Sequence, residues 1–302
     1  MLRPLPHRGD VVAAGAVALA ALVLLLQLRF DAVWATGVHL VYAAAALAFV
    51  GTLALRAPRE GPDPRAYQSA LLATTFALAV PALTRLAQVF GSDGLDSAGT
   101  LTWVSGLLAT LGFALASARS SALCVLLGAV SLVVAVVAFV YWAFSPHGFG
   151  TARWLLLALA GALALGTVAQ RDRRPARALA LADAGGLTAL VLALTFALEP
   201  FSEGILGPGA GAGWEIFLYA CGFGLCAFSA VDRVPGPGWI GVAVLVTTTF
   251  VVAGGATTLI GWPLVLAAGA GALLTIGLRP SRPLPPPPAR DDADVLEIRM
   301  ER

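Results

Sequence analysis

The sequence predicts an all-α integral membrane protein, a polytopic bundle of about ten transmembrane helices. Of its 302 residues, 59% are hydrophobic and only 12% are charged, with a mean hydropathy of +0.86. A soluble domain carries about 25% charged residues, so this chain has too few to cover a surface that faces water. All 19 basic residues are arginine, and most fall in the termini and in alternate loops between apolar runs. This alternation is typical of a multi-pass membrane protein.

Each apolar run is long enough to cross a bilayer as one helix. Crossing requires about 20 mostly apolar residues, and a helix closes the backbone hydrogen bonds that lipid cannot satisfy. We therefore expect a transmembrane bundle over residues 1–278. The ten predicted spans are residues 11–29, 33–55, 67–90, 100–118, 121–144, 151–170, 178–199, 214–231, 238–257 and 259–278.

The first run has some features of a secretory signal peptide. Arg3 and Arg8 precede it, but it is longer than a usual signal core. The small-residue site that follows, Ala32-Val-Trp-Ala35, is a weak cleavage site. We therefore expect this run to remain as the first helix.

The arginines predict the orientation of the bundle. With the N-terminus inside, nearly all loop arginines face inward, and the outer loops carry only Arg29 and Arg153. Both termini are then cytoplasmic. Alanine-rich runs and arginine in place of lysine suggest a GC-rich bacterial genome, so we expect the plasma (inner) membrane of a bacterium.

Tryptophan positions give an independent prediction of the same orientation, because indole prefers the headgroup level. Trp239 is at a predicted inner end. The tryptophans at predicted outer ends are Trp34, Trp103, Trp142, Trp154, Trp214 and Trp262.

The sequence also contains an internal repeat. Residues 154–175 align without gaps to residues 262–283, with 11 identities in 22 positions. A weaker match links Gly51-Thr52 to Gly166-Thr167, and Thr-Phe-Ala-Leu occurs at both 75–78 and 195–198. These matches predict a parallel repeat with a period of four helices. The alternative is coincidence in a chain whose spans begin with tryptophan and end with arginine.

The last segment, residues 279–302, is proline-rich and then charged. Its run of prolines predicts extended polyproline II structure. We expect a disordered cytoplasmic tail or, alternatively, a docking peptide for a protein partner.

Ionisable residues inside spans are functional candidates because they are expensive to bury in lipid. Arg85, Glu199, Glu215 and His39 all fall near outer ends and predict a polar binding cluster there. An ion pair between Arg85 and Glu199 would lower the cost of both. The alternative is a set of anchors that reach the interface.

Asp183 is the remaining candidate, near the inner end of its span. It is either a carboxylate that couples to a proton or cation, or a solvated residue paired with Arg177. The absence of lysine excludes Schiff-base cofactors, and three scattered histidines do not predict a metal site. We therefore expect no cofactor and no metal. Cys124, Cys221 and Cys226 lie within apolar runs and predict no disulfide framework.

Three function classes fit these features, and the bilayer, rather than nucleic acid, is the expected partner. A carrier or channel for a small solute or lipid ranks first, ahead of a non-catalytic membrane subunit, scaffold or sensor. An intramembrane enzyme using Glu199 and Glu215 on a lipid-linked substrate ranks third, so an enzyme is not favoured. The span count resembles that of the drug/metabolite transporter superfamily. That family has two inverted five-helix halves rather than a parallel four-helix repeat, so no family is assigned.

Overall fold

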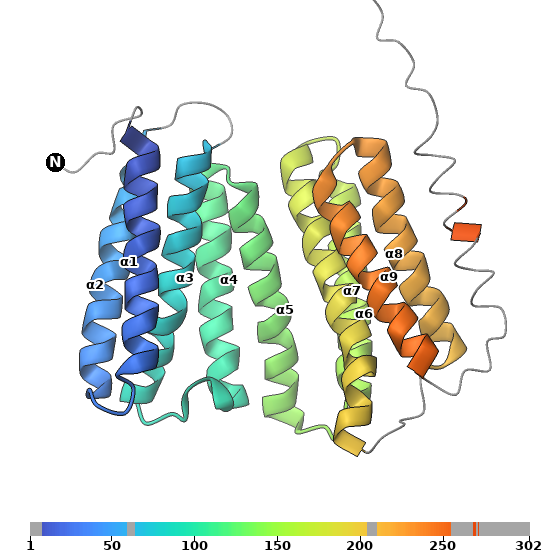
Figure 1. The fold of residues 1–302 in the computed structure, drawn as a ribbon, viewed down its shortest axis with the longest axis horizontal. Coiled ribbons are helices and arrows are strands. Elements are labelled where there is room, and N and C mark those ends of the chain that lie inside the picture. The colour runs from blue at the N-terminus through green and yellow to red at the C-terminus, as the bar shows by residue number, and fades with distance from the viewer. Residues whose placement is uncertain (1–7, 59–63, 204–209, 255–267, 270, 272–302) are drawn as a thin grey trace, which may run out of the picture.

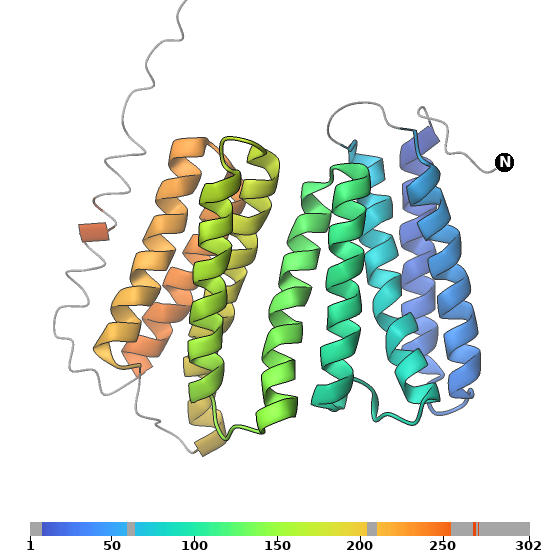
Figure 2. The same cartoon turned by 180° about the vertical axis from the view of Figure 1, so that it is seen from behind.

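The computed structural model describes residues 8–58, 64–203, 210–254, 268, 269 and 271. Within these residues the chain forms nine long α-helices and no strand (Figures 1 and 2). A short 3₁₀ turn, η2 (Gly94–Asp96), precedes the fourth helix. The helices are α1 (Gly9–Arg29), α2 (Thr36–Arg56), α3 (Ala66–Val89), α4 (Ala98–Arg119), α5 (Ala122–Phe144), α6 (Gly150–Gln170), α7 (Pro175–Glu203), α8 (Ala212–Asp232) and α9 (Pro235–Gly254).

All nine helices are long and apolar enough to cross a membrane. The chain is therefore a multi-pass helical membrane protein in contact with the lipid bilayer. Each of these helices begins and ends within four residues of a predicted span. The tenth predicted span, 259–278, lies almost wholly outside the described residues, as does the tail 279–302.

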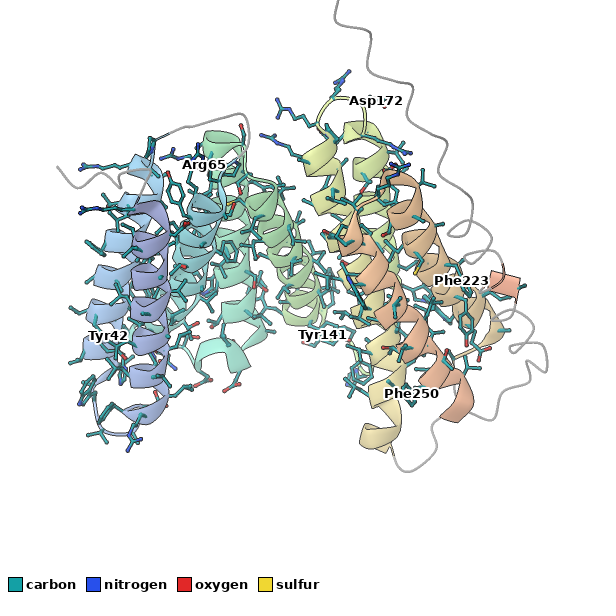
Figure 3. The ribbon with its side chains drawn as sticks, turned by 45° about the horizontal axis from the view of Figure 1, so that its top comes forward. Tyr42, Arg65, Tyr141, Asp172, Phe223 and Phe250 are labelled. Atoms are coloured by element: carbon teal, nitrogen blue, oxygen red, sulfur yellow. The ribbon has the colours of Figure 1, made fainter. Side chains whose placement is uncertain are left out.

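The helices run alternately up and down, so the bundle has two distinct ends (Figure 1). At one end α1, α3, α5, α7 and α9 begin and the other helices finish; we call this the arginine end. We call the opposite end the tryptophan end. Figure 3 places Arg65 and Asp172 at the first, and Tyr42, Tyr141 and Phe250 toward the second. The tryptophans at helix ends on that second side are Trp34, Trp103, Trp142, Trp154 and Trp214.

The helices form two groups, α1–α5 and α6–α9, that stand side by side in both views (Figures 1 and 2). The contact between α5 and α7, with a smaller one between α5 and α6, joins them. Small residues allow the closest approaches. Gly112 of α4 lies against Gly128 of α5, and Gly222 of α8 lies against Gly241 of α9.

The pairs of helices in contact recur with a step of four. The first set contains six pairs of helices in contact. They are α1–α2, α1–α3, α2–α3, α3–α4, α3–α5 and α4–α5. Adding four to each number gives the remaining major helix contacts of the described part, from α5–α6 to α8–α9. Gly128 and Gly241 are each the seventh residue of their helix, and Leu and Val follow each glycine at the same spacing.

One part of the predicted repeat has no such structural match. Thr75 is the tenth residue of α3, whereas Thr195 is the twenty-first residue of α7. At 1.5 Å per residue the two Thr-Phe-Ala-Leu segments differ in depth by about 16 Å. The segments are therefore not at equivalent positions, and Arg85 has no counterpart in Glu199.

Candidate functional site

Arg85, the arginine inside a predicted span, is held by a polar network between α1 and α3. Its Nη2 forms an ion pair with Asp31 at 2.5 Å, and its Nε donates to Gln27 Oε1 at 2.7 Å. Its Nη1 donates to Gln88 Oε1, one turn further along α3, at 2.8 Å. The Arg85 side chain is 13% exposed and that of Asp31 is 61% exposed. The guanidinium is thus paired within its own helix group, near the tryptophan end.

His39 lies beside this network on α2 and is fully buried. Its Nε2 is 3.2 Å from the Phe30 carbonyl, which can only accept, so Nε2 carries the proton. Its Nδ1 is hydrogen-bonded to the Tyr42 hydroxyl at 2.5 Å. Trp34 stacks on Phe30 and covers the same corner. Both ring nitrogens are thus engaged, and these contacts hold the α1–α2 turn.

Asp183 of α7 lies near the arginine end, where α9 begins. A Cβ built on Gly236, in the first turn of α9, would lie 3.0 Å from Asp183 Oδ2. The carboxylate therefore faces a helix N-terminus, where the helix dipole favours negative charge. Its Oδ1 is buried and has no hydrogen-bond partner among the described residues.

Glu215 lies in the first turn of α8 at the tryptophan end and is only 2% exposed. Neither its Oε2 nor the hydroxyl of Tyr219, one turn along, has a hydrogen-bond partner in the described part. Glu199 belongs to α7, but its side chain lies outside the described residues.

Of the four predicted site residues whose side chains the structure describes, two lie together. Arg85 and His39 share one corner of α1–α3, whereas Glu215 is on α8 in the other helix group (Figure 1). Asp183 is at the opposite end of the bundle. The expected outer cluster does not form from these side chains, because α3 and α8 pack into different groups.

A cleft of about 430 Å³ lies between the two helix groups, and sequence reasoning did not find it. Its walls come from α4 and α5 on one side and from α6 and α7 on the other. The lining is mostly aliphatic, including Val134 and Val191. The hydroxyls of Thr188 and Thr195 bond to carbonyls of their own helix, and that of Tyr141 bonds to the Gly148 carbonyl. The surface of the cleft is therefore apolar, and each of these three hydroxyls has a hydrogen-bond partner.

Arg153 of α6 lies at the tryptophan end of this cleft. Its guanidinium stacks on the Phe196 ring at 3.7 Å and donates to the Thr195 hydroxyl and carbonyl. These contacts with α7 fix the position of the Arg153 guanidinium near the tryptophan end of α6.

A second cavity, of about 390 Å³, lies between α6, α7 and α8, on the other side of the α6–α7 pair. Small residues open it, including Gly161 and Gly224, where an added Cβ would meet no atom within 4 Å. The sequence signal for this second cavity lies in the spacing of small residues. In a chain this rich in alanine and glycine, that signal does not stand out from its background.

Among the described residues, no group of three or more histidine, cysteine or acidic side chains is placed to hold a metal ion. Comparison of the chain with protein-family models, with curated proteins and with solved structures finds no match. The fold defines the class of protein, a multi-pass helical membrane protein. The two cavities are the features of the described residues that bear on its function.

Proposed function

We propose that the protein is a carrier for a lipid-like, amphipathic solute, which enters the cleft between the two helix groups. The observation that carries this proposal is the apolar cleft with Arg153 at its tryptophan end. An acyl chain fits such a lining, because binding sites for apolar ligands are concave, apolar and typically 300–1,000 Å³ in volume. The Arg153 guanidinium, which stacks on Phe196 and donates to Thr195, places a basic group beside the tryptophan end of the cleft.

The pairing of polar groups favours lipid over a polar solute. Arg85, the strongest candidate for a polar path, is engaged by Asp31, Gln27 and Gln88 within one helix group. Most buried threonine hydroxyls bond to carbonyls of their own helices, as in Thr75. The described helices thus offer a polar solute few free partners.

In the described part of the chain, the first group meets the second mainly through α5, which contacts α6 and α7. Arg177 of α7 also donates to the Ala116 carbonyl of α4. The four-step recurrence of helix contacts supports two parallel repeat units.

The proposal is tested by translocation of fluorescent phospholipid in proteoliposomes. With native protein, dithionite should quench more label than the outer-leaflet fraction quenched in empty vesicles. Val134→Phe combined with Val191→Phe places two rings in the cleft and should slow translocation several-fold. The control Val41→Phe, at an α2 position that is 70% exposed, should leave the rate unchanged. Equal quenching in empty and protein-containing vesicles would refute the carrier proposal.

A non-catalytic membrane subunit is the second candidate, and the same pairing of polar groups favours it. A protein of this kind would show no translocation and would co-purify with one partner in fixed ratio. Purification from native membranes in mild detergent, followed by mass determination of the intact complex, distinguishes the two functions.

A further inference from the structure

The groove between α6, α7 and α8 extends to the arginine end of the bundle. Along α6 it is lined from Leu157 to Arg171, a rise of about 21 Å. One leaflet accounts for about 15 Å of the hydrocarbon core, so the groove runs from headgroup depth past the midplane. Its other wall is formed by α8, including Phe217, Cys221 and Phe228.

The groove changes character where it reaches the membrane surface. The groove is the cavity of about 390 Å³ described above. A third cavity, of about 500 Å³, adjoins it between the α6–α7 turn and the end of α8. Arg171 and Phe228 line both spaces, so one site has an apolar part and a polar part. Arg171 Nη2 lies 2.7 Å from Asp232 Oδ1, and its guanidinium lies 5.7 Å from the centre of the Phe228 ring.

The charge around the polar part is positive. The charged residues that line the polar part are Arg171, Asp172 and Asp232. The exposed arginines Arg173, Arg174 and Arg233 flank them along the chain, so these six residues together carry an excess of two positive charges. The Arg171 side chain is 52% exposed although it pairs with Asp232, so it retains donors for another anion. Figure 3 shows nitrogen-bearing side chains around Asp172 at this end.

We propose that this groove binds an anionic phospholipid from the leaflet at the arginine end. One acyl chain lies between α6 and α8, over Gly161 and Gly224, and the phosphate lies beside Arg171. Basic pockets between transmembrane helices bind anionic headgroups in this way. The site is separate from the cleft of the proposed function, because none of its lining residues is shared.

Substitutions at Gly161 and Gly224 test the apolar part of the site. Because an added Cβ at Gly161 or Gly224 meets open space, Gly161→Leu and Gly224→Leu should fill the groove without displacing protein atoms. Gly106→Leu on α4 is a matched control, since its Cβ also meets open space but lies outside the groove.

The experiment uses the purified full chain in nanodiscs that contain phosphatidylglycerol with a photoactivatable group on one acyl chain. Cross-links should concentrate on residues 157–168 of α6 and 217–228 of α8. Gly161→Leu and Gly224→Leu should each reduce them several-fold, and Gly106→Leu should not. Phosphatidylcholine with the same chain should cross-link less.

Arg171→Gln tests the headgroup part separately. It should bring phosphatidylglycerol and phosphatidylcholine to equal cross-linking while the acyl contacts remain. Arg56→Gln, at the exposed end of α2, should preserve the preference for the anionic lipid. An even distribution of cross-links over the outer faces of all helices would overturn the proposal. So would insensitivity to both groove-filling variants, or occupation of the groove by a second copy or by residues 259–278. This is a binding measurement, so its failure is distinct from a failure of translocation.

Discussion

The contact between α4 and α5 permits a sharp test of how the bundle is packed. A Cβ added at Gly112 would lie 2.6 Å from Gly128 Cα, 2.8 Å from Gly128 N and 3.0 Å from the Cys124 carbonyl oxygen. Ordinary contact for a Cβ begins near 3.4 Å, so Gly112→Ala requires the two backbones to separate locally by about 0.8 Å. All three obstacles are backbone atoms, so no side-chain rotation relieves the clash.

The expected magnitude follows from two opposing effects. Overpacking of this kind destabilises a protein by about 1–3 kcal/mol. Alanine is favoured over glycine in a helix by about 1 kcal/mol. We therefore expect Gly112→Ala to lower the free energy of unfolding by roughly 0–2 kcal/mol, and to be less stable than a variant that gains the same helix propensity without the clash. Reversible unfolding in mixed micelles, followed by circular dichroism, measures this difference.

Alanine substitutions at two further glycines, Gly128 and Gly106, allow the expected losses of stability to be ranked. At Gly128 the nearest backbone atoms, Phe113 N and the Ala109 carbonyl oxygen, would be 3.2 and 3.3 Å from an added Cβ, so a smaller loss is expected. At Gly106, on the same helix as Gly112, the added methyl meets open space and should be neutral or stabilising. If Gly112→Ala proved as stable as Gly106→Ala, the close α4–α5 packing would be refuted.

Two other predictions address the polar network and the orientation. Arg85→Gln should destabilise the fold by about 1–3 kcal/mol, because it leaves the buried Gln27 carbonyl oxygen without its donor. Asp31→Asn should cost less than about 1 kcal/mol, because Asp31 is largely exposed; equal losses in the same unfolding assay would contradict this asymmetry. Ser120→Cys and Ser145→Cys flank α5 at opposite ends. In a cysteine-free background, an impermeant maleimide should label intact cells only at Ser145→Cys, and labelling of Ser120→Cys instead would reverse the proposed orientation.

The nine described helices could be predicted because span length and apolar content depend on local sequence alone. Their contacts depend on tertiary structure and could not be predicted. The sequence gives no reason to prefer Asp31 as the partner of Arg85, because it reads as a solvated loop acid. Likewise Gly112 and Gly106 look equivalent in an alanine-rich helix, and only the position of α5 distinguishes them.

The arginines at one end of the bundle have two competing explanations, and the structure separates them. Arginine favours helix C-termini, and here Arg119 donates to the Ala57 carbonyl beyond α2 while Arg177 donates to the Ala116 carbonyl of α4. If helix ends were the cause, the helices that finish at the tryptophan end should also carry arginine there. The last turns of α3, α5 and α7 carry no basic residue, and α1 alone ends with Arg29.

The position of Arg177 is one that the helix dipole disfavours. It lies in the first turn of α7, where that dipole disfavours a cation. The arginines therefore follow a side of the bundle rather than a type of helix end. We infer that a difference between the two faces of the membrane explains this, because the positive-inside rule acts on loops irrespective of helix direction. On this inference, topology determines which side of the bundle carries Arg119 and Arg177. Their hydrogen bonds to helix-end carbonyls are a secondary, local effect.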